Sequence, residues 1–414
     1  MKWKLKNLCI LFVALVLSFQ AACNSSENTS NSNYSGNSKK TVSNTPTEAL
    51  SSSPPAEQAS ASLGQQSDTS LASNDKEAGF TVKPYDDVRA LFDNKGIISK
   101  NDYNPEDIIT YNFNEATVLE GSEKLKDEIM NNGKNPGLGI RELHNKGITG
   151  KGINVAIIDQ NLLLHHPEFD GKIVAYYDTG CEQDVSSGSM HAPAVTSILA
   201  GNTNGVAPDV KVYFAAVPSW KKDSEFYAKG LYWIIEENKK LPEDEKIRVV
   251  SVSAAPSGDG SPFIKNLNMW DEAVLAAQNE GILVLDCCKN PKTGFIAPAF
   301  YDPEDPDNIA RCIGGFPTST YVVPASHIGV PTSYRTVAEE YVEGSPSYQY
   351  TGKGGLSWGI PYAAGVLALG WQINPDLNNT QIVQTLFDTC STSNDGSNII
   401  NPAAFIDAIE KIKK

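Results

Sequence analysis

Cysteine is scarce in this chain of 414 residues, and its seven copies form no framework. Two of them, Cys9 and Cys23, lie in an N-terminal leader segment. The remaining five are Cys181, Cys287, Cys288, Cys312 and Cys390. An odd and sparse set is not the pattern of a disulfide-stapled secreted domain. The chain also has no C-x-x-C pair, no H-E-x-x-H segment and no histidine spacing typical of a metal site, so the sequence predicts no zinc centre.

Positive charge is in deficit, since the net charge is −15 and becomes −18 once the three lysines of the leader are removed. Such a balance argues against nucleic acid or an anionic membrane surface as a partner. It is compatible with cationic substrates, although a merely solvated acidic surface explains it as well. The phosphate-binding loop with Gly-Lys-Ser/Thr and the dinucleotide-binding glycine fingerprint are both missing, and nothing repeats internally.

The apolar run near the N-terminus, residues 8–19, is too short to span a membrane comfortably. It follows three lysines and precedes Ala21-Ala22-Cys23, which is the pattern of a secretory signal over residues 1–22. A cysteine after two small residues resembles a bacterial lipoprotein signal, although Gln20 stands where such signals usually carry leucine. The resemblance implies that Cys23 is lipidated and holds a secreted protein at the extracytoplasmic face of a bacterial membrane. The alternative is an ordinary signal peptide with an incidental cysteine.

Residues 24–79 are rich in Ser, Asn, Thr, Gln and Ala and contain almost no large apolar residue. Such a segment cannot bury enough surface to offset its chain entropy. We therefore expect residues 23–79 to be a lipidated cysteine followed by a disordered tether with an average span of about 40 Å.

The part from about residue 136 onward alternates between strand and helix patterns, as in an α/β domain with a mostly parallel sheet covered on both faces. The expected strands are residues 153–158, 210–217, 249–252, 282–285 and 309–313. The expected helices are residues 194–200, 224–238, 271–279, 361–371, 380–388 and 402–412. Sites in such sheets form beyond the carboxyl ends of the strands, where Asp159, Ser253 and Asn290 fall.

Residues 80–135 show weaker patterns, with strand-like pieces at 80–82 and 108–113 and a helix-like run at 123–130. We expect an extension packed on the main domain, because no compact strand-helix-strand unit is visible. A folding or inhibitory prosegment is the alternative.

Three short segments place an acid, a base and a nucleophile at strand or helix ends. They are Val155-Ala156-Ile157-Ile158-Asp159, His191-Ala192-Pro193-Ala194-Val195 and Gly355-Leu356-Ser357-Trp358-Gly359-Ile360-Pro361. Alone, Ser357 reads as a helix N-cap, His191 as a structural histidine and Asp159 as a carboxylate in need of a partner. Together they are the set that acyl transfer through a hydroxyl requires.

These segments resemble, in the same order, the signatures of subtilisin-like serine proteases, the subtilases. The similar positions are residues 150–159 with His166-Pro167-Glu168-Phe169; His191 with Val195 and Gly205-Val206-Ala207-Pro208; Gly355-x-Ser357 with Pro361 and Ala364-Gly365; residues 281–290; and residues 250–253. The resemblance covers roughly residues 136–414 and implies a three-layer α/β/α, subtilisin-like fold.

The resemblance also implies a serine endopeptidase acting on polypeptides. Ser357 would attack the carbonyl, His191 would act as base and acid, and Asp159 would orient the histidine. The oxyanion would be held by Asn290 and the Ser357 N–H, and substrate backbone would pair with Ser253 and Ala254. No cofactor is required; calcium is frequent in the family, and the acidic residues 302–307 are candidate ligands without establishing a site.

The chain departs from the family pattern beside each group. The departures are Gln160-Asn161 after the aspartate, Ala192-Pro193-Ala194 after the histidine, Trp358-Gly359 after the serine, and Cys287-Cys288 with Lys289 before the asparagine. None removes a catalytic group, so an active enzyme is the main hypothesis. A catalytically inactive subtilase-fold lipoprotein that binds peptides or surface proteins is the alternative, and a processing enzyme for one dedicated precursor is a third.

Overall fold

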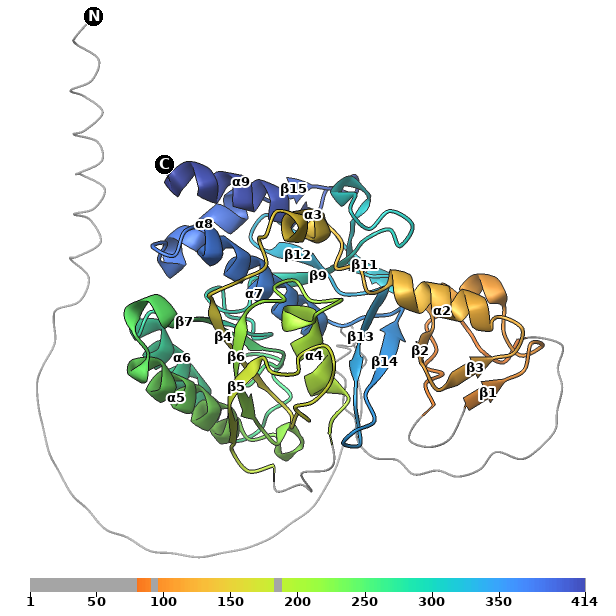
Figure 1. Cartoon of the computed structure of the whole chain (residues 1–414), viewed down its shortest axis with the longest axis horizontal. Helices are drawn as coiled ribbons and strands as arrows, with labels where there is room; N and C mark the ends of the chain where they lie inside the picture. The colour runs from red at the N-terminus through yellow and green to blue at the C-terminus, as the bar shows by residue number, and fades with distance from the viewer. Residues whose placement is uncertain (1–79, 91–95, 182–187, 414) are drawn as a thin grey trace, which may run out of the picture. The chain divides into compact units, whose positions relative to one another are not determined.

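The computed structural model describes residues 80–90, 96–181 and 188–413 (Figure 1). The predicted signal, Cys23 and the tether lie outside the described residues and stay predictions. Within the described ranges, no helix combines the length and apolar character needed to cross a bilayer.

Five parallel strands form the central sheet in the order β5-β6-β4-β7-β8. Their bounds are β4 (Asn154–Asp159), β5 (Ile173–Asp178), β6 (Lys211–Ala216), β7 (Ile247–Val252) and β8 (Leu283–Leu285). All six residues of β4 are buried, as a continuous apolar run predicts for a strand covered on both faces. Because successive side chains point to opposite faces, Val155 and Ile157 join one apolar core while Ala156 and Ile158 join the other.

Helices cover both faces of this sheet (Figure 1). On one face lie α4 (His191–Ala200) and α7 (Leu356–Ile373), and on the other α5 (Ser224–Lys240) and α6 (Leu267–Asn279). The small residues of α7 allow close packing: a Cβ added at Gly365 would lie 2.7 Å from the Cβ of Val206. The predicted three-layer α/β/α fold with a mostly parallel sheet is confirmed.

A second, mixed sheet in the order β11-β10-β9-β12-β16-β15 extends the domain. Its strands are β9 (Ile296–Phe300), β10 (Ile313–Phe316), β11 (Ser319–Thr320), β12 (Ile328–Pro331), β15 (Ser391–Thr392) and β16 (Asn398–Ile399). α7 packs on this sheet through β9 and β12, and three further helices pack on α7 or on one another: α3 (Ile140–Asn145), α8 (Asn379–Asp388) and α9 (Pro402–Lys413). Short 3-10 turns are η2 (Ser219–Lys221), η3 (Glu243–Glu245) and η4 (Ile309–Arg311).

The strand predicted at residues 309–313 is wrong over most of its length, because η4 occupies it and β10 begins only at Ile313. Within this turn, the Arg311 guanidinium pairs with Asp302 at 2.5 Å. The backbone N–H of Cys312 donates to the carbonyl of Ile309 and closes the turn.

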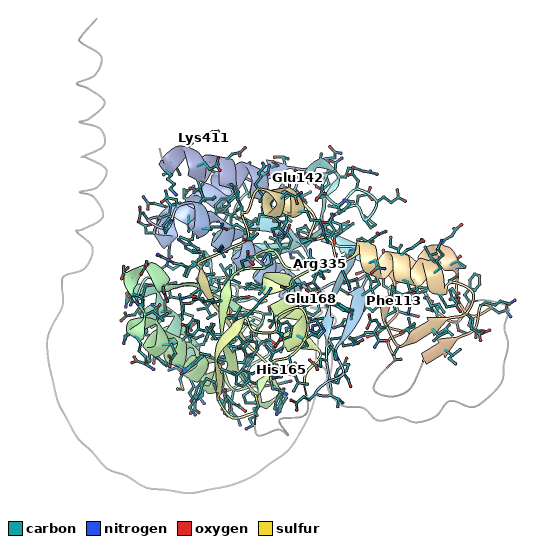
Figure 2. All side chains as sticks on the ribbon, in the orientation of Figure 1. Phe113, Glu142, His165, Glu168, Arg335 and Lys411 are labelled. Carbon is teal, nitrogen blue, oxygen red and sulfur yellow. The ribbon has the colours of Figure 1, made fainter. Side chains whose placement is uncertain are left out.

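The N-terminal extension folds as β1 (Gly96–Ile98), η1 (Pro105–Thr110), β2 (Asn112–Asn114), β3 (Thr117–Leu119) and α2 (Glu123–Asn132). β2 pairs antiparallel with β14 (Ser347–Thr351), which pairs with β13 (Arg335–Glu339). Phe113, labelled in Figure 2, is fully buried and stacks on Tyr350 with 4.9 Å between ring centroids.

Within this extension, the helix expected at residues 123–130 is confirmed. The strand expected at 80–82 is wrong, since residues 81 and 82 form a bend and residue 80 has no regular structure. The strand expected at 108–113 starts only at Asn112, because Pro105 begins a 3-10 helix capped by the side chain of Asn104.

Candidate active site

Asp159 ends the central strand β4, and its side chain is held from two sides. The carboxylate accepts a hydrogen bond from the backbone N–H of Gln160 at 2.8 Å. It also accepts from Nδ1 of His191, at 2.8 Å to Oδ1 and 3.0 Å to Oδ2. Asp159 is 4% exposed, and a carboxylate so deeply buried needs such partners.

His191 begins α4, where Ser189 Oγ accepts the N–H of Ala192 and supports the first turn. The imidazole is partly open, with 24% of its side chain exposed. Burial alone would lower the pKa of His191, but the charge and hydrogen bond of Asp159 raise the pKa above its ordinary value. Since Nδ1 donates to Asp159, Nε2 of the neutral ring is the atom that can accept a proton.

Ser357 is the second residue of α7 and exchanges hydrogen bonds with Ser253, just past the end of β7. Because Pro361 lacks an N–H, the Ser357 carbonyl has no helical donor four residues ahead, and Ser253 Oγ donates to it at 2.8 Å. In return, Ser357 Oγ donates to the Ser253 carbonyl at 3.3 Å, which is long and weak. Among the described residues the Ser357 hydroxyl has this one acceptor and does not bond to His191.

Trp358 links the helix of the serine to the histidine. Its ring stacks on the imidazole of His191, with 5.3 Å between centroids and 28° between planes. The residue is 8% exposed and forms part of the core beneath α7. Sequence reasoning treated Trp358 only as a departure from a family pattern, although an aromatic residue directly after the serine was the available signal.

Asn290 lies on the loop that follows β8, and β8 is the neighbour of β7 in the central sheet. Its Oδ1 accepts the N–H of Lys292 at 3.0 Å, which leaves the amide nitrogen without an acceptor in the described part of the chain. Its backbone carbonyl accepts from Thr293 and, at 2.7 Å, from Gly294. Lys289, beside it, is exposed.

Gly294 closes this loop against its own start. A Cβ added there would overlap the carbonyl oxygen of Cys288 and lie 2.8 Å from the carbonyl carbon. Its backbone φ is ordinary, so the requirement for glycine comes from space alone. Sequence reasoning missed this residue, because nothing in its neighbourhood signals the approach.

Asp286 and Cys287 fasten the start of this loop to α6 and to the segment after β7. The buried Asp286 carboxylate accepts from Trp270 Nε1 and from the N–H of Cys288, each at 3.0 Å, and Cys287 N–H donates to the Ala254 carbonyl at 2.9 Å. Burial raises the pKa of both Cys287 and Cys288, so these thiols stay protonated and are poor nucleophiles.

The structure therefore joins the predicted site residues in two pairs, Asp159 with His191 and Ser253 with Ser357, and Trp358 bridges the pairs. Ala254 and Asn290 lie in the segments that follow the neighbouring strands β7 and β8, but within the described ranges they contact neither pair through a hydrogen bond. Substrate pairing by Ser253 and Ala254 and oxyanion binding by Asn290 stay predictions.

The His166-Pro167-Glu168-Phe169 segment stands apart from this site and has a structural role. His166 Nε2 donates to the Ser347 carbonyl at 2.9 Å. Glu168, labelled in Figure 2, accepts from the N–H of Thr203 at 2.8 Å and from the hydroxyl of Tyr348 at 2.7 Å. The segment thus fastens the loop after β4 to β14.

Within the described residues, no group of three or more His, Cys, Asp or Glu side chains could hold a metal ion. In the acidic segment 302–307, Asp302 and Asp305 face Arg311, and Asp307 accepts the N–H of Gly139 at 2.8 Å. These carboxylates already have protein partners and fit poorly with the six to eight oxygens that calcium takes.

Comparisons with known proteins give the family and the fold. The model of the Subtilase family (Peptidase S8) matches residues 150–401. The chain is 27% identical over 273 residues to Subtilisin Savinase of Lederbergia lenta, covering 63% of this chain and 93% of that protein. It is equally similar to an alkaline protease of Alkalihalobacillus alcalophilus, but there it spans 66%, just under two thirds, of the relative's length. Among solved structures, a chain of the subtilase cytotoxin SubAB assembly matches with a TM-score of 0.52 and 15% identity, over 67% of this chain and 96% of that one, which shows a shared fold alone.

Proposed function

The chain belongs to the subtilase family, and on that premise we propose that it is a serine endopeptidase that hydrolyses peptide bonds through an acyl-enzyme. The observation that carries the proposal is the pair of hydrogen bonds from His191 to the buried Asp159, beside the start of the helix that bears Ser357. A buried carboxylate behind a partly open imidazole, with a hydroxyl at a helix N-terminus next to it, is the constellation of a serine nucleophile and its base.

In the first half of the proposed reaction, the Ser357 hydroxyl leaves the Ser253 carbonyl and turns to His191. The bond given up is the 3.3 Å one, so the rotation costs little. Oγ then attacks the scissile carbonyl as its proton passes to Nε2, and Asp159 stabilises the imidazolium. The oxyanion receives the Asn290 amide and the Ser357 N–H, one of the free donors in the first turn of α7.

Collapse of the tetrahedral intermediate breaks the C–N bond. The proton on Nε2 passes to the leaving amine, and the acyl group stays on Ser357. Water then attacks the ester with His191 as base again, which releases the second product and restores the hydroxyl. Apart from the substrate and this water, the proposed cycle uses only side-chain and backbone groups named above.

The test is labelling of the full-length protein with a fluorophosphonate probe. We expect covalent labelling and peptide hydrolysis in the parent and neither in Ser357→Ala. Ser326→Ala is the matched control, because Ser326 is exposed on a loop remote in sequence from the site segments. Hydrolysis that survives Ser357→Ala contradicts the proposal.

A second candidate is a non-catalytic protein that binds peptides or surface proteins on a subtilase fold. It is favoured by the Ser357 hydroxyl facing Ser253 instead of His191, and by the altered residues beside each catalytic group. This candidate predicts peptide binding by the folded parent without fluorophosphonate labelling. If the enzyme instead serves one dedicated precursor, labelling occurs but unrelated denatured proteins are not cleaved.

We further propose that the enzyme is held at the extracytoplasmic face of a bacterial membrane by lipid on Cys23. The support is sequence alone: three lysines, a short apolar run and a small-residue pair before the cysteine. Metabolic labelling with an alkynyl fatty acid tests it. Incorporation that persists in Cys23→Ser contradicts the proposal.

Residues 80–135 are, we propose, a permanent part of the domain and not a removable prosegment. β2 is the third strand of the β13-β14-β2 sheet, and Asn114 Nδ2 donates to the buried Glu339 at 3.0 Å. The Gly352 N–H also donates to Asn112 Oδ1 at 3.1 Å. Removing the segment would leave Glu339 and the Gly352 N–H without these hydrogen bonds, and it would expose the core around Phe113 to solvent.

A further inference from the structure

We propose that Trp358 is a positioning residue that holds the plane of the His191 ring and stabilises its protonated form. The inference rests on the proposed function, since it concerns the base of that reaction. The observation behind it is the stacked contact between the two rings, 5.3 Å between centroids at 28°.

The first part of the argument is geometric. The hydrogen bonds from Nδ1 to Asp159 fix one edge of the imidazole, but the ring can still pivot about that edge. The indole face lies against the ring and blocks that pivot, in the offset stack that aromatic pairs prefer. Trp358 is itself immobilised, because it is 8% exposed and packs into the core beneath α7.

The second part is electrostatic. The face of an indole attracts a cation that lies within about 6 Å of it, and the imidazole lies within that range. Among the described residues, Asp159 on β4 is the charged group that acts on His191, and α7, which brings Trp358 to the ring, carries no acidic or basic residue. Trp358 therefore adds to the effect of Asp159 and favours the imidazolium that forms when Ser357 gives up its proton.

The third part is the link to the nucleophile. Trp358 follows Ser357 directly, and its N–H donates to the Gly355 carbonyl at 2.9 Å in the first turn of α7. The same rigid turn thus sets the position of the attacking hydroxyl and the plane of the ring that takes its proton. A residue here without an aromatic face would still position the Ser357 hydroxyl, but it would leave the plane of the His191 ring free to turn.

The main experiment measures the pKa of His191 by NMR titration of the full-length protein, carrying Ser357→Ala and isotope-labelled histidine. The chain has only five histidines, and His191→Gln assigns the resonance. We expect Trp358→Leu to lower the pKa of His191 by about half a unit to one unit, and Trp358→Phe, which keeps an aromatic face, to change it by less than about half of that.

Kinetics on the parent with an intact serine give the second readout. In Trp358→Leu we expect kcat to fall about three- to thirtyfold with KM nearly unchanged, while the acid limb of the pH profile moves to lower pH. A merely structural role would lower kcat without moving the limb. Trp358→Phe should recover most of the loss.

Fluorinated tryptophans keep the proposal testable if the leucine variant does not fold. Fluorine withdraws electron density from the face of the indole and so weakens its attraction for a cation, but it hardly alters the shape of the ring. The pKa of His191 should therefore fall stepwise with each added fluorine. An unchanged pKa across that series, or equal pKa values in the leucine and phenylalanine variants, overturns the inference. Because these titrations need no hydrolysis, an inactive parent would contradict the endopeptidase proposal separately.

Discussion

Replacing Gly294 with alanine should remove most of the hydrolytic activity without altering any reacting group. The added Cβ would overlap the Cys288 carbonyl oxygen and lie 2.8 Å from its carbon. Both are backbone atoms that cannot swing aside, so the loop itself must shift by about 1 Å, and a misplacement of that size can cost about a hundredfold in rate. The Asn290 carbonyl, which accepts the Gly294 N–H at 2.7 Å, moves with the loop.

The magnitude follows from the role proposed for Asn290. A donor must lie within about 2.7–3.1 Å of the developing oxyanion, and loss of one such donor costs about 10²–10³ in kcat. We therefore expect kcat for Gly294→Ala to fall about a hundredfold, equivalent to about 2.7 kcal/mol, with KM within about threefold of the parent. Steady-state hydrolysis of a peptide substrate measures both constants.

A double-mutant cycle with Asn290→Leu sharpens the test. Both changes act through the same amide, so Asn290→Leu with Gly294→Ala should be about as slow as Asn290→Leu alone. Gly281→Ala is the matched control, since a Cβ there meets open space and costs only the strain of its positive φ. The reasoning is refuted if Gly294→Ala keeps activity within about threefold of the parent, or if the two losses multiply.

Three further predictions follow from charge and burial. Asp159 raises the pKa of His191, and His191 must be neutral to act as the base. We therefore expect kcat/KM to fall with decreasing pH around a midpoint above about 6.5. A midpoint at or below that value contradicts the pairing of Asp159 with His191. Arg335 is 3% exposed, lies over the rings of Tyr301 and Tyr362, and forms no ion pair within the described residues. Arg335→Met removes this buried charge, so the melting temperature should stay unchanged or rise. A loss above about 2 kcal/mol in free energy of unfolding would count against this. Phe113→Ala should lower the free energy of unfolding by about 3–5 kcal/mol in urea titration, whereas an unchanged value would contradict a permanent N-terminal extension.

The sequence was a good guide where one property decides the structure. The apolar run before Asp159 predicted a strand buried on both faces, and β4 is that strand. The start of α7 was harder: Pro361 suggested a helix beginning there, since proline favours the first turn. The helix begins at Leu356 instead, because Ser253 supplies the hydrogen bond that Pro361 denies to Ser357. Because this donor lies 104 residues away in the chain, the sequence around Pro361 could not predict it.

The same reason limits what could be predicted of the site. The order of Asp159, His191 and Ser357 pointed to the chemistry, but the contact of Trp358 with His191 joins residues on two helices that only the fold brings together. Gly294 has an ordinary backbone conformation, so its requirement arises from the closing of one loop and not from a turn signal. The hydrophobic pattern of a sequence predicts its helices and strands, but it does not predict which of their surfaces contact one another.

The pairing of β2 with β14 has a consequence for how the chain reaches its native state. About 240 residues separate Asn112 from Gly352, which donates to it. Closing a loop of that length costs about 5 kcal/mol of chain entropy, and contacts so distant in sequence slow folding. Because the partner strand is made late in synthesis, the edge of β2 stays without its neighbour until most of the chain has emerged. An unpaired strand edge invites aggregation during that interval, and the domain completes its fold only when its last fifth arrives.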